Sequence, residues 1–204
     1  AYGVYMGIKA AAKHRLGVDS LSGLRVAVQG VGHVGYYLCG HLAAEGAELL
    51  VADIAQDSLD RVQREFDAHV VAPEAIATAA VDIYAPCALG ATLNDETLPK
   101  LQAKIVAGSA NNQLAEARHG EALRQRGILY APDYVINAGG VIVISHEGPA
   151  YDESKAFAHV AKIHDTLLEI FRRADAQKVA TSTAADRLAE ERFRKPAAKA
   201  TRAA

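Results

Sequence analysis

The sequence predicts an α/β protein built on a doubly wound parallel sheet. Short β-branched apolar runs alternate with segments able to form helices, which is the pattern of parallel strands joined by helical connections. The first of these runs leads directly into a glycine-rich turn. Half of the 204 residues are hydrophobic, which is enough to bury one large core. We therefore expect a single folded domain with flanking helices at both ends.

The first expected element is a helix over residues 2–16, because apolar residues recur at roughly helical spacing and Gly17 follows as a stop. The run 24–29 is short and β-branched, so we expect a strand there. After the glycine turn, residues 34–44 are expected to form a helix that stops at Gly46. This first unit is therefore a strand, a glycine turn and a helix.

A second strand is expected over 47–52, ending at Asp53. The helix expected after it covers residues 57–66, with Asp57 as its N-cap. Further short strands are expected, each next to a segment able to form a helix. They cover residues 69–71, 81–85, 105–107 and 128–130.

Beyond Pro149 the pattern changes to one apolar stripe, expected on a long helix over residues 154–177. The stripe includes Phe157, Leu167 and Phe171. A chain of this size should not leave such side chains in water, so we expect exposed apolar surface that a further domain or a partner would cover.

The carboxyl-terminal part is expected to hold a second helix over residues 183–193, followed by a basic, alanine-rich tail that stays disordered. The predicted organisation has three parts: a sheet domain with its opening helix, a pair of helices packing on it near an interdomain cleft, and the tail. These parts cover residues 1–150, 151–193 and 194–204.

The overall charge and the cysteines exclude several classes of protein. Lys and Arg number 22 against 24 Asp and Glu, so nothing favours nucleic acid or a membrane surface as a partner. Cys39 and Cys87 lack a CxxC companion, which argues against a disulfide framework and a zinc site. No apolar run is long enough for a membrane span, and residues 1–14 lack the order of a signal peptide. We expect a cytoplasmic protein without a metal site.

The turn after the first strand has the spacing of a dinucleotide-binding loop. Its first glycine permits a tight turn, its second lets the backbone approach a pyrophosphate, and its third allows close packing of helix on strand. Free N–H groups at the start of the helix then bind phosphates without a basic side chain. The alternative is an ordinary strand-to-helix turn. The loop reads Gly30, Val31, Gly32, His33, Val34 and Gly35.

An acidic residue after the second strand makes this motif more specific. Asp53 stands where a carboxylate accepts hydrogen bonds from the adenosine ribose hydroxyls. The alternative is an Asp that merely ends a strand. An ionised Asp53 repels a 2′-phosphate, and neither Ile54 nor the two residues after it offer a cation. The sequence therefore predicts a Rossmann domain that binds NAD rather than NADP, unless Arg61 or Arg64 on the following helix offsets the repulsion.

Other chemistries find little support. The eight histidines form no HExxH pair, and neither a GxSxG elbow nor a Walker-type lysine loop is present. His33 in the glycine loop is isolated, and we assign it no role in proton transfer. Lys9 and Lys13 are four residues apart on the opening helix and are expected on a solvated face. No catalytic residue is predicted within the chain.

Several longer segments resemble one family of enzymes. They are AYGVY at the start, then VAVQGVGHVGYYL, DIYAPCALG, GSANNQL and YAPDYVINAGGVI. With Gly7 and Lys9 they are similar to the cofactor domain of the leucine, phenylalanine, valine and glutamate dehydrogenases, over nearly all of residues 2–193. The resemblance implies an NAD-binding domain of an amino acid dehydrogenase. It also implies a homo-oligomer, which is usual in that family.

The resemblance further implies cofactor contacts outside the glycine loop. Cys87 and Ala88 would lie against the adenosine and its ribose. Ala110 and Asn111 would lie around the nicotinamide ribose, with Asn112 close by. From the residues alone, Cys87 is interpreted as a small core residue at a strand end, and the alternative for Asn112 is a turn residue that bonds its own backbone.

Asn137 is the most informative residue of the last motif. The resemblance places it near the nicotinamide and the main-chain groups of the substrate, and Val141 on one wall of the substrate pocket. The alternative for Asn137 is backbone capping. Gly139 and Gly140 weaken any helix in this segment, so we expect close packing of other atoms there.

The activity that the resemblance implies is reversible oxidative deamination of an amino acid to a 2-oxo acid and ammonia, with hydride transfer to NAD. Family members use two lysines and an aspartate as base and cations, and these are expected upstream, in a substrate domain absent from this chain. The motifs favour leucine, with valine, phenylalanine and glutamate left open. A non-catalytic NAD-binding or regulatory module is the competing interpretation. A dehydrogenase of hydroxy acids or sugars is disfavoured by the AYGVY, GSANNQ and NAGG segments together.

Overall fold

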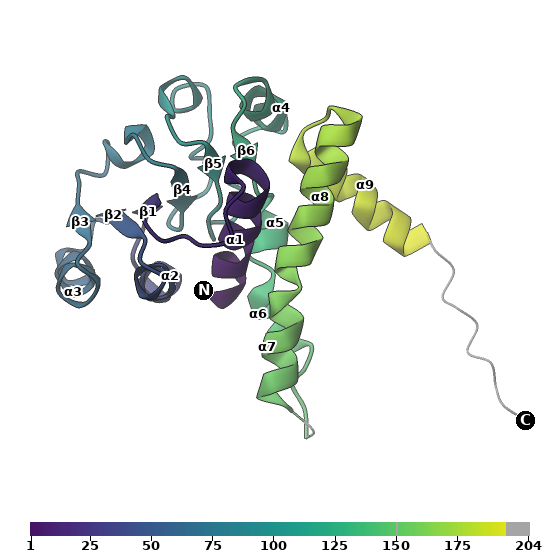
Figure 1. The fold of residues 1–204 in the computed structure, drawn as a ribbon, viewed down its shortest axis with the longest axis horizontal. Helices are drawn as coiled ribbons and strands as arrows, with labels where there is room; N and C mark the ends of the chain where they lie inside the picture. Colours follow the sequence, from purple (N-terminus) through teal and green to yellow (C-terminus); the bar gives the residue numbers. More distant parts are fainter. Residues whose placement is uncertain (150, 195–204) are drawn as a thin grey trace, which may run out of the picture.

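The computed structural model describes residues 1–149 and 151–194. Its centre is a six-stranded sheet with the order β3-β2-β1-β4-β5-β6, and every neighbouring pair is parallel (Figure 1). The chain starts in the middle at β1, winds outward to β3, crosses back to β4 beside β1 and winds outward again to β6. This is the doubly wound arrangement of the Rossmann fold, so the predicted fold class is confirmed.

Each expected strand forms, although most are shorter than the apolar run that predicted them. Strand β4 begins at Ile83 rather than at Val81, because the Val81 N–H donates to Ala79 O within a turn and not to a neighbouring strand. The bounds are β1 Arg25–Gln29, β2 Glu48–Ala52, β3 His69–Val70, β4 Ile83–Pro86, β5 Ile105–Val106 and β6 Leu129–Tyr130.

Helices cover both faces of the sheet, with α2 and α3 on the opposite side from α4 (Figure 1). The bounds are α1 Tyr2–Leu16, α2 His33–Ala44, α3 Gln56–Phe66, α4 Arg118–Gln125, α5 Asp133–Ile136, α6 Gly139–Ile144, α7 Glu153–Ala161, α8 Ile163–Gln177 and α9 Thr181–Arg194, with 3₁₀ turns η1 Ile76–Thr78 and η2 Leu98–Lys100. None of the described helices is long and apolar enough to cross a membrane.

Alternation along the strands creates two hydrophobic cores. Val26 and Val28 of β1 face the larger core, which includes residues of α1, α2, α3, α8 and α9. Ala27 points to the other face, where Tyr84 and Leu123 belong to the second core. Successive side chains of a strand point to opposite faces, so a run that is apolar throughout is buried on both sides.

The expected exposed stripe on the carboxyl-terminal helices is wrong for two of its three residues. Leu167 and Phe171 are fully buried, because α8 packs against α1 of the same chain. Gly7 allows this close approach, since a Cβ there would lie 2.9 Å from Leu167 Cδ1. Only Phe157 stays half-exposed. The long helix is also interrupted, because α7 and α8 meet at Lys162.

Two local expectations also fail. Helix α3 begins at Gln56 with Ala55 as its N-cap, because Asp53 accepts the Ala55 N–H and turns the chain before Asp57. Lys9 is not on a solvated face, since it forms an ion pair with the part-buried Glu45 at the end of α2. The segment around Gly139 forms two short helices, α5 and α6, with an interruption between them, and of the two glycines expected to pack closely Gly139 does so against Gly3 and Val160 while Gly140 has open space. The tail predicted from residue 194 lies outside the described residues except for Arg194, which ends α9.

Candidate functional site

The glycine loop joins β1 to α2 at the carboxyl edge of the sheet. Gly30 has a φ of +91°, a conformation that side chains rarely adopt, and its N–H donates to Ala52 O at 2.8 Å. A Cβ on Gly35 would lie 1.9 Å from Gly30 O, so the helix packs directly on the turn. Gly32 is exposed and has no atom within 4 Å of its Cβ position. The loop thus leaves one open approach to its backbone, at Gly32.

Asp53 stands beside this loop and holds it. Its Oδ2 accepts the N–H of Val31 at 2.7 Å, and its Oδ1 accepts the N–H of Ala55 at 2.9 Å. Sequence reasoning gave Asp53 one role only, toward a ribose, and missed this bond to the loop. The neighbouring Ile54 is 97% exposed and Val31 is buried, so the two predicted contact residues differ in what they present to solvent.

A cavity of about 300 Å³ lies between α2 and α3, beside the glycine loop. Arg61 lines it, with its guanidinium 3.7 Å from the centre of the Tyr36 ring and an ion pair to Glu65 at 3.2 Å. Arg64 does not line it. Of the two cations that might counter the charge of Asp53, Arg61 is therefore the one beside the loop. The other lining residues are Val31, Gly32, His33, Tyr37 and Ser58.

The segment after β4 lies against the glycine loop. A Cβ on Gly30 would be 2.7 Å from Ala88 Cβ, and Ala88 is exposed. The N–H of Cys87 donates to Gln29 O at 2.7 Å, and burial raises the pKa of its thiol. Cys39 is fully buried, which raises the pKa of its thiol to about 12. Both cysteines are therefore held as neutral thiols near pH 7.

The segment after β5 brings two of the predicted asparagines together. Asn137 Nδ2 donates to Asn111 Oδ1 at 2.6 Å and also lies 3.4 Å from Ser109 O. Ala110 is 5% exposed, so its methyl faces the protein interior. Asn112 has a φ of +52°, in the left-handed region that asparagine tolerates better than most residues. Its observed role is therefore to turn the backbone.

A larger cavity, of about 790 Å³, opens at the same edge of the sheet. Its polar side chains include Asn111 and Asn137, and most of the rest of its lining is apolar. Val141 lines it and is largely exposed. Gly140 has open space at its Cβ position, whereas Gly139 packs near Gly3 Cα. The remaining lining residues are Ala1, Tyr2, Val4, Val34, Ser109, Ile136, Val143, Ile144, Phe157 and Val160.

Sequence reasoning did not assign the contributions of α1 and α7 to this cavity. Tyr2 packs 5.4 Å from Phe157 between ring centres, and both side chains line the cavity wall. The sequence did contain a signal for it. The AYGVY segment was part of the family resemblance, but its residues were not assigned to the site. Helix α1 precedes the sheet in the chain and α7 follows it. Only the packing of α7 onto α1 in the structure shows that they meet at this cavity.

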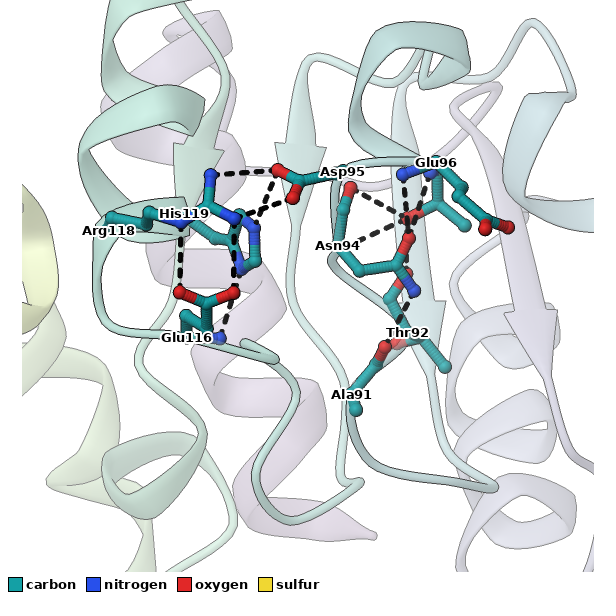
Figure 2. A network of polar contacts seen from close by, with 9 residues as sticks. Ala91, Thr92, Asn94, Asp95, Glu96, Glu116, Arg118 and His119 are labelled. Carbon is teal, nitrogen blue, oxygen red and sulfur yellow. Dashed lines mark hydrogen bonds and ion pairs between the residues drawn. The ribbon is translucent and has the colours of Figure 1, made fainter.

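A separate polar cluster fastens the loop after β4 to the start of α4 (Figure 2). Arg118 donates to both oxygens of Asp95, at 2.8 and 2.5 Å, and to both oxygens of Glu116. The buried His119 bonds Asp95 through Nε2 at 3.1 Å and accepts the Glu116 N–H through Nδ1. Ligand atoms of Asp95, Glu116 and His119 lie within 4.8 Å of one another, but the Arg118 guanidinium already supplies the positive charge between the carboxylates.

Replacing Arg118 by Met is expected to lower the stability of the chain at neutral pH and much less in acid. Arg118 lowers the pKa of Asp95 to about 2 from an ordinary value near 3.8. A lowered pKa contributes stability above the unfolded value, and this contribution is lost as pH falls through about 2. Urea unfolding of wild type, Arg118→Met and Arg118→Lys between pH 2 and 6 measures it. The Lys variant should retain part of the effect, and a difference independent of pH would contradict this account.

Comparison with known proteins shows which family this chain resembles over most of its length. The family model described as "Glutamate/Leucine/Phenylalanine/Valine dehydrogenase" matches residues 48–201. Leucine dehydrogenase of Bacillus cereus is 55% identical over 193 residues, which cover 95% of this chain and 53% of that protein. The crystal structure of L-tryptophan dehydrogenase from Nostoc punctiforme superposes with a TM-score of 0.91 at 52% identity, covering 94% of this chain and 58% of that one.

A hetero-hexameric glutamate dehydrogenase from Thermus thermophilus has the same fold, with a TM-score of 0.71 at 24% identity over 94% of this chain and 50% of that one. The chain spans about half the length of the curated relatives it matches. The match of the family model over most of the sheet and the carboxyl-terminal helices, together with the resemblance of the motifs, establishes the classification. The chain belongs to the glutamate, leucine, phenylalanine and valine dehydrogenase family.

Proposed function

We propose that this chain is the NAD-binding part of an amino acid dehydrogenase that oxidatively deaminates a branched-chain L-amino acid, with leucine as the preferred substrate. The observation that supports it most is the glycine loop held by Asp53, next to a cavity that the Asn111 and Asn137 side chains enter. The whole reaction also requires proton-transfer groups, and the described residues do not supply them at this cavity.

The pyrophosphate would lie over Gly32, at the amino end of α2, where the backbone is open and N–H groups are free to bind it. The adenosine ribose would bond Asp53, and the nicotinamide end would reach the Asn111 and Asn137 pair. The proposed cofactor contacts are Gly30, Val31, Gly32, His33, Val34, Gly35, Asp53, Ile54, Cys87, Ala88, Ala110, Asn111 and Asn137.

The carboxylate of Asp53 supports NAD over NADP. Both of its oxygens already accept backbone N–H groups, so the charge is fixed in place at the end of β2. A 2′-phosphate there would meet that charge at short range. Arg61 lines the adjacent cavity but is engaged with Tyr36 and Glu65, so it offsets this repulsion only in part.

The larger cavity supports an amino acid with an apolar side chain. Val141, Ile144 and Phe157 give it an apolar wall, and Asn137, which also lines it, would bond the main-chain groups of the substrate. NAD, when bound, supplies the hydride acceptor for the α-carbon. The residues of this chain would orient the two reacting carbons and exclude water from the apolar side.

The proton transfers would come from outside the described residues. Lys9 and Lys13 pair with Glu45 and Asp19, and neither lines the cavity. We propose that a substrate domain supplies the two lysines and the aspartate, and that residues 1–150 bind the cofactor while 151–193 pack over its edge. Assembly into a homo-oligomer is proposed too, as the family resemblance implies; the glutamate dehydrogenase from Thermus thermophilus with the same fold is a hetero-hexamer.

The test is a titration of the chain with NADH and with NADPH, followed by NAD reduction with leucine, valine, phenylalanine, tryptophan and glutamate. We expect NADH to bind at least tenfold more tightly than NADPH, a difference of about 1.4 kcal/mol. Binding without reduction supports a cofactor part separated from its catalytic groups, and equally the alternative of a non-catalytic NAD-binding module. Joining a substrate domain from a relative distinguishes them, because only a cofactor part gains turnover. Absence of NADH binding would refute the proposal.

A further inference from the structure

Two buried polar side chains hold the segment after β5 and take no direct part in the proposed site. Gln113 is 0% exposed and Asp133 is 8% exposed. With His119 they are the buried polar or charged side chains of the described residues. A buried polar group costs stability unless its hydrogen bonds are made, so what these two bond shows what they do.

Gln113 braces the turn that leads to Asn111. Its Nε2 donates to Gly108 O at 2.9 Å and to Ala110 O at 3.0 Å, the carbonyls on either side of Ser109. Its Oε1 has no hydrogen-bond partner among the described residues. The side chain therefore acts through its NH₂ group, and both N–H donors are used on this one turn.

Asp133 connects the same turn to the helix that ends before Asn137. Its Oδ2 accepts the Gln113 N–H at 2.7 Å, and its Oδ1 accepts the Tyr134 N–H in α5 at 2.7 Å. The Tyr130 hydroxyl lies 3.2 Å from the Asp133 N–H and accepts it. A carboxylate that accepts two backbone N–H groups from two segments fixes their relative position.

These bonds hold the two segments that carry the asparagine pair. Gln113 fixes the backbone on both sides of Ser109, and the Asn137 amide contacts Ser109 O and Asn111 Oδ1. Asp133 fixes α5, whose next residue after Ile136 is Asn137. The backbone around Asn111 is closely packed, because a Cβ on Gly90 would be 2.6 Å from Asn111 O. A shift at either buried residue is thus passed to the pair.

We propose that Gln113 and Asp133 are positioning residues that set the Asn111 and Asn137 side chains for the nicotinamide end of the cofactor. This inference rests on the proposed function. It predicts a division within the dinucleotide: the adenosine and pyrophosphate bind to the glycine loop and Asp53, which these two residues do not contact, and only the nicotinamide half depends on them.

The experiment compares NADH with ADP-ribose, which lacks the nicotinamide, on the full chain. Gln113→Met keeps the side-chain volume and removes both N–H donors. We expect it to weaken NADH binding about tenfold, which corresponds to the loss of one or two hydrogen bonds. The dissociation constant of ADP-ribose should stay within about twofold of the wild-type value. The fluorescence of bound nicotinamide should fall as well. Gln125→Met, the same change at an exposed site on α4, is the matched control.

Asp133→Asn provides the second variant, because it keeps the shape and removes one of the two acceptors. It is likewise expected to weaken NADH binding and to leave ADP-ribose binding nearly unchanged. Equal weakening of both ligands, or unchanged NADH binding by folded variants, would overturn the inference. Failure of wild type to bind either ligand would refute the proposed function itself. Circular dichroism and the melting temperature of each variant establish that the folded protein is being compared.

Discussion

Replacing Gly35 by Ala is expected to destabilise the chain by about 3 kcal/mol, at the upper end of the cost of overpacking a core, and to abolish NADH binding. The added Cβ would lie 1.9 Å from the carbonyl oxygen of Gly30, so α2 and the glycine turn cannot both stay in place. Neither the added Cβ nor the Gly30 backbone oxygen can move aside in the way that the end of a flexible side chain can. Urea unfolding and NADH titration measure the two effects.

Gly32→Ala provides the control that separates folding from binding. No atom lies within 4 Å of the Cβ position of Gly32, so the free energy of unfolding should change by less than about 1 kcal/mol. The new methyl nevertheless occupies the open approach to the loop, and NADH binding should weaken. If Gly35→Ala unfolds like wild type, the packing of α2 on the turn is not as described. If Gly32→Ala binds NADH like wild type, the pyrophosphate lies elsewhere.

The sheet was predictable from local patterns. A β-branched run, a glycine turn and a mostly apolar helix make a unit whose residues contact their neighbours in sequence, so β1, the loop and α2 follow from residues 24–44 alone. The ends of strands were less predictable. Strand β4 starts two residues late because the Val81 N–H bonds Ala79 O in a turn, and the apolar run carries no signal for that turn.

Whether the apolar stripe of the carboxyl-terminal helices is buried within the chain depends on contacts between segments that are distant in sequence. Periodicity showed an apolar stripe with Leu167 and Phe171 but not its partner. The small residues of α1, including Gly7, allow α8 to approach, and they were interpreted only as part of a resemblance. Hydrophobic pattern indicates that a face is buried, and the choice between the same chain and another one requires three-dimensional packing.

The candidate site shows the same division. The glycine spacing and Asp53 are a local motif with a physical meaning, so they were found from the sequence. Asn111 and Asn137 were singled out only by resemblance, since 26 residues separate two side chains whose atoms lie 2.6 Å apart. The bracing by Gln113 was missed, because a lone glutamine carries no pattern. Its role is visible only from its complete burial and its two carbonyl partners.

Asp53→Arg is expected to weaken NADH binding about a hundredfold, because the variant loses charge-assisted hydrogen bonds to the ribose. The same change should bring NADPH binding level with NADH binding or above it, since the carboxylate that repels a 2′-phosphate becomes a cation. Titration of both nucleotides against wild type and the variant measures the ratio of the two dissociation constants.

Two contributions of Asp53 must be separated in that measurement, because the carboxylate also accepts the Val31 N–H at 2.7 Å. Loss of this acceptor loosens the glycine loop and weakens NADH and NADPH alike. Asp53→Asn keeps the shape and one oxygen but removes the charge, so it reports mainly on the repulsion. A ratio of dissociation constants that shifts toward NADPH in both variants supports the electrostatic account. Equal weakening of both nucleotides in both variants would mean that Asp53 acts on the loop alone, and the choice between NAD and NADP would then rest with Arg61 and the cavity beside it.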